Sequence, residues 1–187
     1  MRASDEVRDE NELRARDDVR GEKELRTRDD VLAILDTVPD PEVPAISVVE
    51  LGIVRDASVT DDGAVTVTIT PTYSGCPAMF EIEADVRAAL VAAGAKRVDV
   101  RTVLAPAWTT DWMSDEAKEK LRAYGIAPPG RTAGDDLVTL TRRRTAVACP
   151  FCGSTDTRLQ SEFGSTACKA IHVCNACRQP FDEFKAI

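Results

Sequence analysis

The chain has 187 residues, of which 43% are apolar, and its formal net charge is −8 at pH 7. This composition can supply a hydrophobic core, and the negative charge argues against a general electrostatic grip on nucleic acid or on an anionic membrane. No apolar run approaches the roughly 18 residues of a membrane span, and the charged start has no apolar signal segment, so we expect a cytoplasmic protein. In that reducing compartment six cysteines indicate metal or thiol chemistry, while a single histidine excludes a metal site built mainly from imidazole.

Residues 1–26 form a charged arm, and a short repeat runs from it into the next segment: ELRARDDV (12–19) returns as ELRTRDDV (24–31). Two copies offset by twelve residues do not indicate a solenoid. We expect a solvated extension, helical or disordered, and the alternative is an arm that docks a partner.

Residues 27–125 are predicted to form one α+β domain with the element order helix, strand, strand, helix, strand, helix. A capping-box pattern from Thr27 to Asp30 opens the first helix, and Pro39 ends it. The stretch VTVTIT (65–70) alternates valine or isoleucine with threonine, which is typical of a half-buried strand. The expected elements are a helix before Pro39, strands over 53–59 and 65–70, a helix from Pro77 to Gly94, a strand over 97–104 and a helix over 114–125.

Residues 126–146, which begin rich in proline and glycine, are predicted to be a linker, and residues 147–187 a small second domain. This domain contains CPFCGS (149–154) and CNAC (174–177), two Cys-x-x-Cys pairs separated by 21 residues, slightly more than zinc sites usually have. Each pair can turn two sulfurs towards one ion, and two pairs complete a tetrahedral shell. We predict a zinc ribbon in which one structural ion is held by Cys149, Cys152, Cys174 and Cys177. Iron has the same four-sulfur chemistry, and two reversible disulfides are the alternative.

The rest of the ribbon offers little else to hold it together. About 40 residues bury too little surface to fold alone, so the metal should supply much of the stability. A minimal core is expected from Phe151, Phe163, Phe181 and Phe184. Cys168 and His172 are alternative ligands, but we favour strand positions for both because four cysteines already close the shell. Basic and acidic residues balance in the ribbon, which argues against nucleic acid as a partner; Arg142–Arg144 is a linker end or a docking point for an acidic partner.

Cys76 stands apart from the other cysteines, in the stretch PTYSGCPAMF (71–80) between a predicted strand and a predicted helix. The unpaired N–H groups and dipole of that helix should lower the pKa of the thiol, and Tyr73–Gly75 should form a small exposed loop around it. Cys76 is then a reactive thiolate or a transient metal ligand. A buried cysteine that packs as a small hydrophobe is an equal alternative on physical grounds.

The stretch LAPAWTTDWMS (104–114) carries both tryptophans of the chain, with Thr109, Thr110 and Asp111 between them. One interpretation is a loop near Cys76 that shapes its site. The other is that both aromatic rings cover the edge of the core.

Four motifs together resemble the PaaD family, the D component encoded with the bacterial phenylacetyl-CoA epoxidase of phenylacetate breakdown. They are DPEVPAISVVELGIVR (40–55), PTYSGCPAM (71–79), LAPAWTTDWMS (104–114) and the terminal CPFCGS…CNAC, and the resemblance covers about residues 27–187. The first domain alone is similar to the SufT-like iron–sulfur assembly factors. The arm before residue 27 does not belong to the pattern.

The resemblance implies a non-catalytic accessory protein that helps to mature the metal centres of a multicomponent oxygenase. Its partners would be the di-iron catalytic subunit, the reductase that carries flavin and an iron–sulfur cluster, and the iron–sulfur assembly machinery. In the assembly family the cysteine that matches Cys76 is tied to cluster handling, so a transient cluster or iron would bind there. Asp40, Pro41 and Glu42 match the DPE signature of that family, and Ser74 and Gly75 belong to the supporting loop.

Three other functions compete with a maturation factor. The protein could be a structural subunit of the complex in which Cys76 is part of the core. A nucleic-acid-binding ribbon is disfavoured by the charge, and a thiol oxidoreductase is disfavoured because both Cys-x-x-Cys pairs are better used by a metal.

Overall fold

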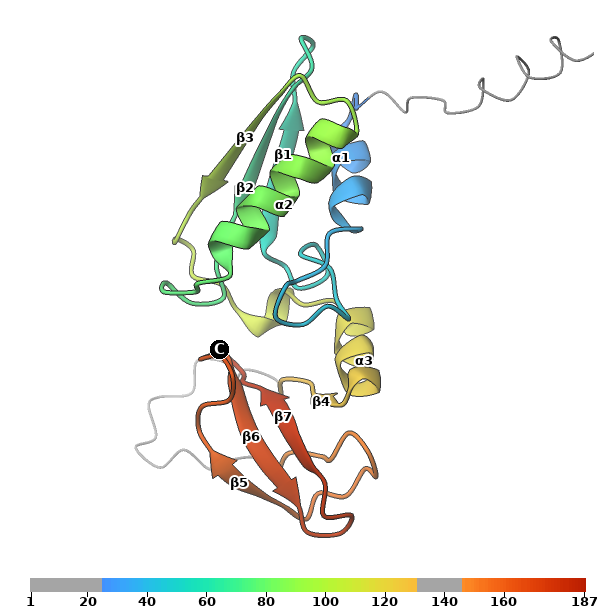
Figure 1. Ribbon diagram of the computed structural model, residues 1–187, viewed down its shortest axis with the longest axis vertical. Helices are drawn as coiled ribbons and strands as arrows, with labels where there is room; N and C mark the ends of the chain where they lie inside the picture. The colour runs from blue at the N-terminus through green and yellow to red at the C-terminus, as the bar shows by residue number, and fades with distance from the viewer. Residues whose placement is uncertain (1–24, 131–145) are drawn as a thin grey trace, which may run out of the picture.

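The computed structural model describes residues 25–130 and 146–187, which form an α+β domain and a ribbon beneath it (Figure 1). The repeated arm before residue 25 and the basic cluster at 142–144 lie outside the described residues. No helix in the described part of the chain is long and apolar enough to cross a membrane.

The first domain has the element order that the sequence predicts. Helix α1 (Arg28–Leu35) begins with a complete capping box: the Thr27 side chain accepts from the Asp30 N–H, and the Asp30 side chain accepts from the Thr27 N–H. Strands β1 (Val54–Val59) and β2 (Ala64–Ile69) pair antiparallel, and β3 (Arg97–Thr102) pairs parallel with β2, so the sheet order is β1-β2-β3.

Helix α2 (Met79–Ala92) is the crossover that the parallel pair requires. It packs against β3, and α1 packs against β1 and α2, so both helices cover the sheet. The buried alternate residues of β2, Val65, Val67 and Ile69, form the centre of the core. This core positions three loops at one end of the sheet: residues 39–53, residues 70–78 and the segment after β3.

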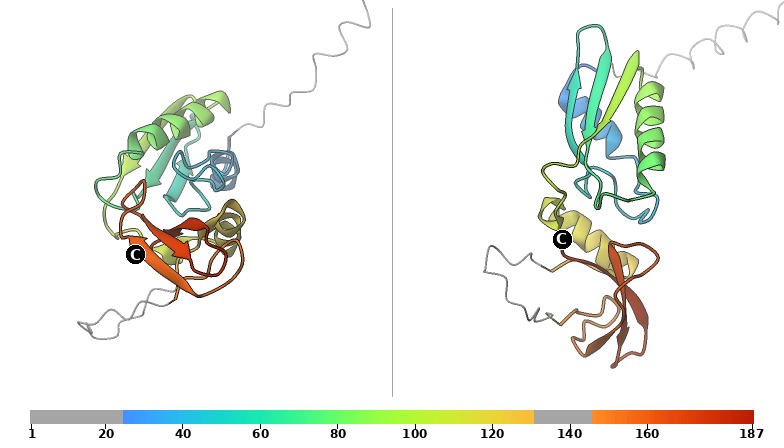
Figure 2. Two further views of the ribbon diagram at one scale, coloured as in Figure 1. Left: turned by 60° about the horizontal axis from the view of Figure 1, so that its bottom comes forward. Right: turned by 90° about the vertical axis from the view of Figure 1, so that its left-hand side faces the viewer.

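That end of the sheet faces the ribbon (Figures 1 and 2). Helix α3 (Asp115–Tyr124) lies between the two sheets in the right-hand view of Figure 2. Its Ser114 side chain caps the first turn by accepting from the Ala117 N–H, and Gly125 ends it in the left-handed conformation, as the sequence predicts.

The ribbon sheet has the order β4-β7-β6-β5, with bounds Ile126–Ala127 for β4, Thr157–Ser161 for β5, Lys169–Cys174 for β6 and Pro180–Phe184 for β7. Its edge strand β4 follows α3 directly and pairs parallel with β7. Composition places residues 126 and 127 in the linker, but both are buried and belong to this sheet. Their apolar side chains cover the ribbon, and this role becomes visible only when their pairing with the distant strand β7 is known.

The predicted ribbon core is half right. Phe181 and Phe184 are buried, but Phe151 and Phe163 are 56% and 66% exposed. Phe184 joins the core of the first domain, where its ring lies 6.0 Å from that of Trp108. The ribbon therefore needs fewer aromatic residues of its own, because it borrows apolar surface from the domain above it.

Candidate functional site

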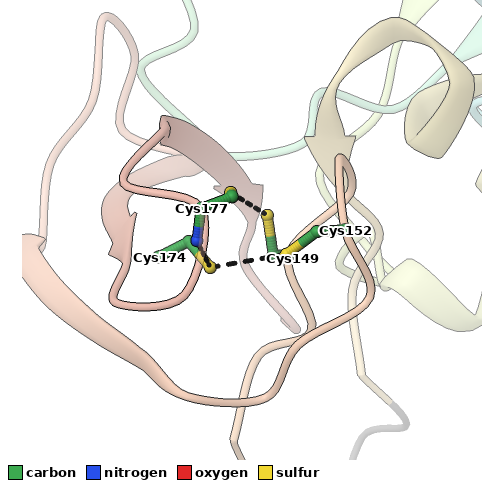
Figure 3. A group of neighbouring side chains, drawn as sticks. All are labelled: Cys149, Cys152, Cys174 and Cys177. Atoms are coloured by element: carbon green, nitrogen blue, oxygen red, sulfur yellow. Dashed lines mark hydrogen bonds between the residues drawn. The ribbon is translucent and has the colours of Figure 1, made fainter.

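The four ribbon cysteines converge on one point (Figure 3). Cys149 and Cys152 come from the turn before β5, Cys174 is the last residue of β6, and Cys177 belongs to the turn between β6 and β7. Gly153 at φ 74° and Arg178 at φ 65° follow the two pairs, and these left-handed residues let each turn close around its sulfurs.

The sulfur geometry fits a tetrahedral metal site. The Sγ atoms of Cys149 and Cys177 are 3.7 Å apart, those of Cys152 and Cys174 are 3.6 Å apart, and all four lie within 4.8 Å of one another. Four sulfurs bound at about 2.3 Å to a tetrahedral zinc ion are about 3.8 Å apart. The N–H of Cys177, which donates to Cys174 Sγ at 3.4 Å, lowers the pKa of Cys174 to about 7, so one ligand is close to its thiolate form at neutral pH.

His172 lies outside this group, as the sequence favours. It sits on β6, where its Nε2 is 2.7 Å from Glu183 Oε2 and its ring stacks on Phe181 at 5.6 Å. Cys168, in contrast, is not a strand residue: β6 begins at Lys169, and Cys168 belongs to the turn before it. The turn carries Cys168 out of the ribbon and into the buried core of the first domain.

The Cys76 loop follows β2 and has the exposed tip that the sequence predicts, at Ser74 and Gly75. The N–H of Cys76 donates to the Tyr73 carbonyl at 3.1 Å, which closes the turn. The side chain of Cys76 is partly buried and packs against the core. Cys76 thus combines features of both interpretations, since it contacts the core yet borders an exposed loop.

The predicted fall in the pKa of Cys76 is wrong. Helix α2 begins at Met79 rather than at Pro77, so the thiol lies just outside the helix end. Burial raises the pKa of Cys76, and although the N–H groups of Ala78 and Met79 lower it, the nearby carboxylates of Glu42 and Asp40 raise it further. The net effect keeps the uncomplexed thiol protonated at neutral pH.

The loop of residues 40–42 is held by its own aspartate. Asp40 is buried, and its Oδ1 accepts from the N–H groups of Glu42 at 2.9 Å and Val43 at 2.8 Å. Burial raises the pKa of Asp40 despite these hydrogen bonds. Pro41 and Glu42 are partly buried, and burial, with the neighbouring Asp40 charge, also raises the pKa of Glu42. Asp40 therefore shapes the loop, and the Glu42 carboxylate lies against the turn before β6, 4.0 Å from Cys168 Sγ.

The threonines of the tryptophan stretch contact the end of the ribbon. Thr109 Oγ1 donates to the Ile187 carbonyl at 2.8 Å, and the Thr110 N–H donates to the same oxygen at 3.1 Å. Asp111 lies with Thr110 in the short 3-10 helix η1 (Thr110–Trp112). Trp108 is buried and donates from Nε1 to the Leu51 carbonyl at 3.2 Å. Through these contacts the stretch joins the two domains. The burial of Trp108 agrees with the interpretation that its ring covers the edge of the core.

Sequence reasoning missed the turn that precedes β6. Cys168 Sγ lies 4.0 Å from Glu42 Oε2, and the Nζ of the buried Lys169 donates to the Glu42 carbonyl at 3.5 Å. The one signal was the 21-residue spacing between the cysteine pairs, whose extra length forms this turn. Nothing local in the sequence indicated that the turn reaches the first domain.

Comparison with known proteins gives two family matches, which cover separate parts of the chain. The family described as "PaaD zinc beta ribbon domain" matches residues 133–185, and the family described as "Iron-sulfur cluster assembly protein" matches residues 28–103. The first match names the ribbon type that the cysteine spacing predicts.

Two individual relatives agree with these matches. A protein of Escherichia coli that is named as part of 1,2-phenylacetyl-CoA epoxidase is 47% identical over 156 residues, which are 83% of this chain and 90% of that protein. An Fe-S protein maturation auxiliary factor of Porphyromonas gingivalis is 42% identical over 89 residues, which are 47% of this chain and 84% of that factor. Among solved structures, a domain of unknown function from Bacillus anthracis has a TM-score of 0.47 and 32% identity, over 50% of this chain and 90% of that one.

Proposed function

Since the chain belongs to the PaaD family, we propose that it is a non-catalytic accessory component of a cytoplasmic phenylacetyl-CoA epoxidase. In this role the chain delivers iron or an iron–sulfur cluster to the metal-containing subunits of the complex. Cys76 is the cargo-holding thiol, and the loop of residues 40–42 supports it. The ribbon holds a structural zinc ion on its four cysteines, which fixes the fold of the domain and takes no part in the transfer.

The observation that carries this proposal is the setting of Cys76. Its thiol lies on the border of an exposed loop, and the charges of Asp40 and Glu42 lie close enough to raise its pKa. The single histidine is paired with Glu183 in the ribbon, so it does not activate Cys76 as a nucleophile. A thiol without a catalytic base, close to carboxylates, suits metal binding better than covalent catalysis.

The raised pKa of Cys76 favours release of the cargo. Metal binding displaces the thiol proton, and the stronger the thiol holds its proton, the weaker the metal binds at neutral pH. When an acceptor subunit offers its own ligands, Cys76 recovers a proton from solvent and the metal moves on. A transfer protein needs such reversible binding, whereas the closed four-sulfur shell retains its ion.

The test is to express the oxygenase and reductase subunits with the wild type or with Cys76→Ser, and to measure the cluster content of the reductase and the turnover of the epoxidase. Both should fall with Cys76→Ser. Ser58→Ala, which removes an exposed hydroxyl on β1, should leave both unchanged. Wild-type cluster content and turnover with Cys76→Ser would refute the delivery role.

A second candidate, a stable structural subunit, is favoured by the outer surface of α2. Phe80 is 84% exposed and Val91 is 56% exposed. They stand eleven residues apart, about three turns, and therefore share one face of the helix. The exposed Ala84 and Ala88 extend this apolar face, which suits docking to an epoxidase subunit. Co-purification at a fixed stoichiometry that Phe80→Ser abolishes would support a stable subunit, and loss of the wild type during purification would count against it.

A further inference from the structure

The ribbon places a second thiol beside the Cys76 loop. The turn of residues 166–168 packs against the loop of residues 40–42, with Cys168 Sγ 4.0 Å from Glu42 Oε2 and 3.0 Å from Thr166 Oγ1. Glu42 is also close enough to Cys76 to raise the pKa of that thiol. Tyr73, whose side chain hydrogen bonds to Cys76, has its pKa raised by burial and by the charges of Cys76, Glu42 and Cys168. One carboxylate thus lies near two thiols that come from different domains.

We propose that Cys76, Cys168 and Glu42 form a composite site, shared by the two domains, that binds one divalent transition-metal ion such as Fe²⁺ as cargo. The inference rests on the proposed function in that it takes Cys76 to be the cargo thiol. It adds that the ribbon supplies the second sulfur and that the first domain supplies a carboxylate.

The ligand types and their separation suit such an ion. A sulfur at about 2.3 Å and an oxygen at about 2.1 Å from one tetrahedral ion lie about 3.6 Å apart. The 4.0 Å between Cys168 Sγ and Glu42 Oε2 is close to that value. Two thiolates and one carboxylate leave a fourth position open, and a ligand of the acceptor protein can enter there. Binding releases the two thiol protons to solvent.

The three ligand atoms are not assembled in advance. Among the residues that the structure describes, only the four ribbon cysteines lie together as a group of metal-binding size. The movement required falls on the Cys76 loop, where Ser74 and Gly75 are exposed, and a Cβ added to Gly75 would meet only the Tyr73 ring, at 3.8 Å or more. Closure of this loop onto Cys168 and Glu42 completes the site.

Cys168 and Glu42 themselves are held firmly. The Lys185 N–H donates to the Cys168 carbonyl at 2.9 Å, and Phe184 beside it is buried against Trp108. Lys169 is only 5% exposed, and its Nζ donates to the main-chain carbonyl of Glu42. The Glu42 carboxylate hydrogen bonds to the side chain of Thr166, a contact that a bound ion would replace. The Lys169 charge lowers the pKa of Glu42 and so helps to keep it ionised.

The competing explanation is that Cys168 only fills space in the core, where it is 4% exposed. A packing residue and a ligand respond differently to substitution. A conservative serine at a packing position leaves metal binding intact as long as the turn is folded. At a ligand position it removes the sulfur that the ion needs.

The experiment is an anaerobic titration of the full chain, with zinc already bound in the ribbon, by Co²⁺, whose thiolate absorption then reports on a second site. The wild type should bind one further equivalent. Cys76→Ser, Cys168→Ser and Glu42→Gln should each weaken that binding at least about tenfold, because even the loss of an outer partner costs about 10–100-fold. Ser165→Ala, an exposed position in the same turn, should bind as the wild type does. Zinc content and the urea midpoint of each variant show whether the turn is folded.

The outcomes separate the two proposals. If Cys76→Ser loses the second equivalent and Cys168→Ser does not, the composite site is refuted while the cargo role of Cys76 stands. If both variants bind as the wild type does, or the wild type binds no second equivalent, the composite site is refuted, and co-expression of Cys76→Ser with the epoxidase subunits decides the cargo role of Cys76. If Cys168→Ser unfolds the turn, Glu42→Gln decides, since a glutamine oxygen can still accept the hydrogen bond that the Glu42 carboxylate accepts from Thr166 of that turn. Unchanged binding in Glu42→Gln would then refute the composite site.

Discussion

Cys76 should be slow to react with alkylating reagents at neutral pH. The thiolate is the reacting form, and a thiol with an ordinary pKa of about 8.5 is only about 3% ionised at pH 7. Burial, Glu42 and Asp40 raise the pKa of Cys76, so its ionised fraction lies below that value. A helix terminus that lowered the pKa to about 7 would instead leave about half of the thiol ionised. The two environments therefore differ at least about 15-fold in the ionised fraction of the thiol at pH 7.

The assay is alkylation of the zinc-loaded chain by iodoacetamide between pH 6 and pH 10, with the Cys76 peptide followed by mass spectrometry. The ribbon cysteines are protected by their metal and Cys168 by burial, so Cys76 should account for the reaction, and Cys76→Ser is the control. The rate constant should rise about tenfold per pH unit through pH 8.5, because each unit increases the thiolate tenfold. Glu42→Gln removes a charge that raises the pKa, so its profile should move to lower pH.

A rate constant that reaches its plateau by about pH 8, as a thiol with a pKa of about 7 would give, would refute this reasoning. It would mean that the N–H groups of Ala78 and Met79, which lower the pKa of Cys76, outweigh burial and the carboxylates. The expectation from the sequence alone, an activated thiolate at a helix terminus, would then be right.

Three further predictions concern stability. Phe184→Ala should destabilise the chain by about 3–5 kcal/mol in urea unfolding because it opens a cavity against the first domain. Phe163→Ala, at an exposed site, should cost no more than about 1 kcal/mol, and equal effects of the two changes would contradict the shared core. Stripping the ribbon metal with a chelator should make four more cysteines reactive, because metal binding supplies about 10–16 kcal/mol in small zinc domains; unchanged thiol counts would rule out a metal-held ribbon. Gly52→Ala should lower the melting temperature more than Gly94→Ala. Both glycines have a positive φ, but a Cβ at position 52 would lie 2.9 Å from Trp112, whereas a Cβ at position 94 would meet nothing within 4 Å. Equal melting temperatures would show that the contact with Trp112 relaxes at no cost.

Local patterns explain why much of the fold was predictable. The capping box at Thr27, the alternation in β2 and the serine cap of α3 each act within a few residues, and the structure contains all three. The Cys-x-x-Cys pairs belong to the same class, because two sulfurs three residues apart need only one tight turn to face an ion. Their convergence required nothing more than the hairpins that join them.

Long-range packing explains what was missed. β4 is recognisable only through β7, which lies more than fifty residues further along the chain. Phe184 is buried with its ring against Trp108 of the first domain, whereas Phe163, equally apolar, is left exposed. The raised pKa of Cys76 likewise comes from burial first and from Glu42 and Asp40 next, and all of these depend on packing between distant segments.

The docking of the ribbon gives the two groups of thiols different tasks. Four sulfurs within 4.8 Å can form a closed shell, and in the proposed function its ion stabilises a domain that has only two buried phenylalanines of its own. That domain in turn holds Cys168 and Lys169 against the loop of residues 40–42, through Phe184 and the pairing of β4 with β7. In the proposed function the first ion is therefore needed to present the ligands of the second. A ribbon that served only its own stability would not need to bury a cysteine and a lysine beside Glu42, whose charge raises the pKa of Cys76.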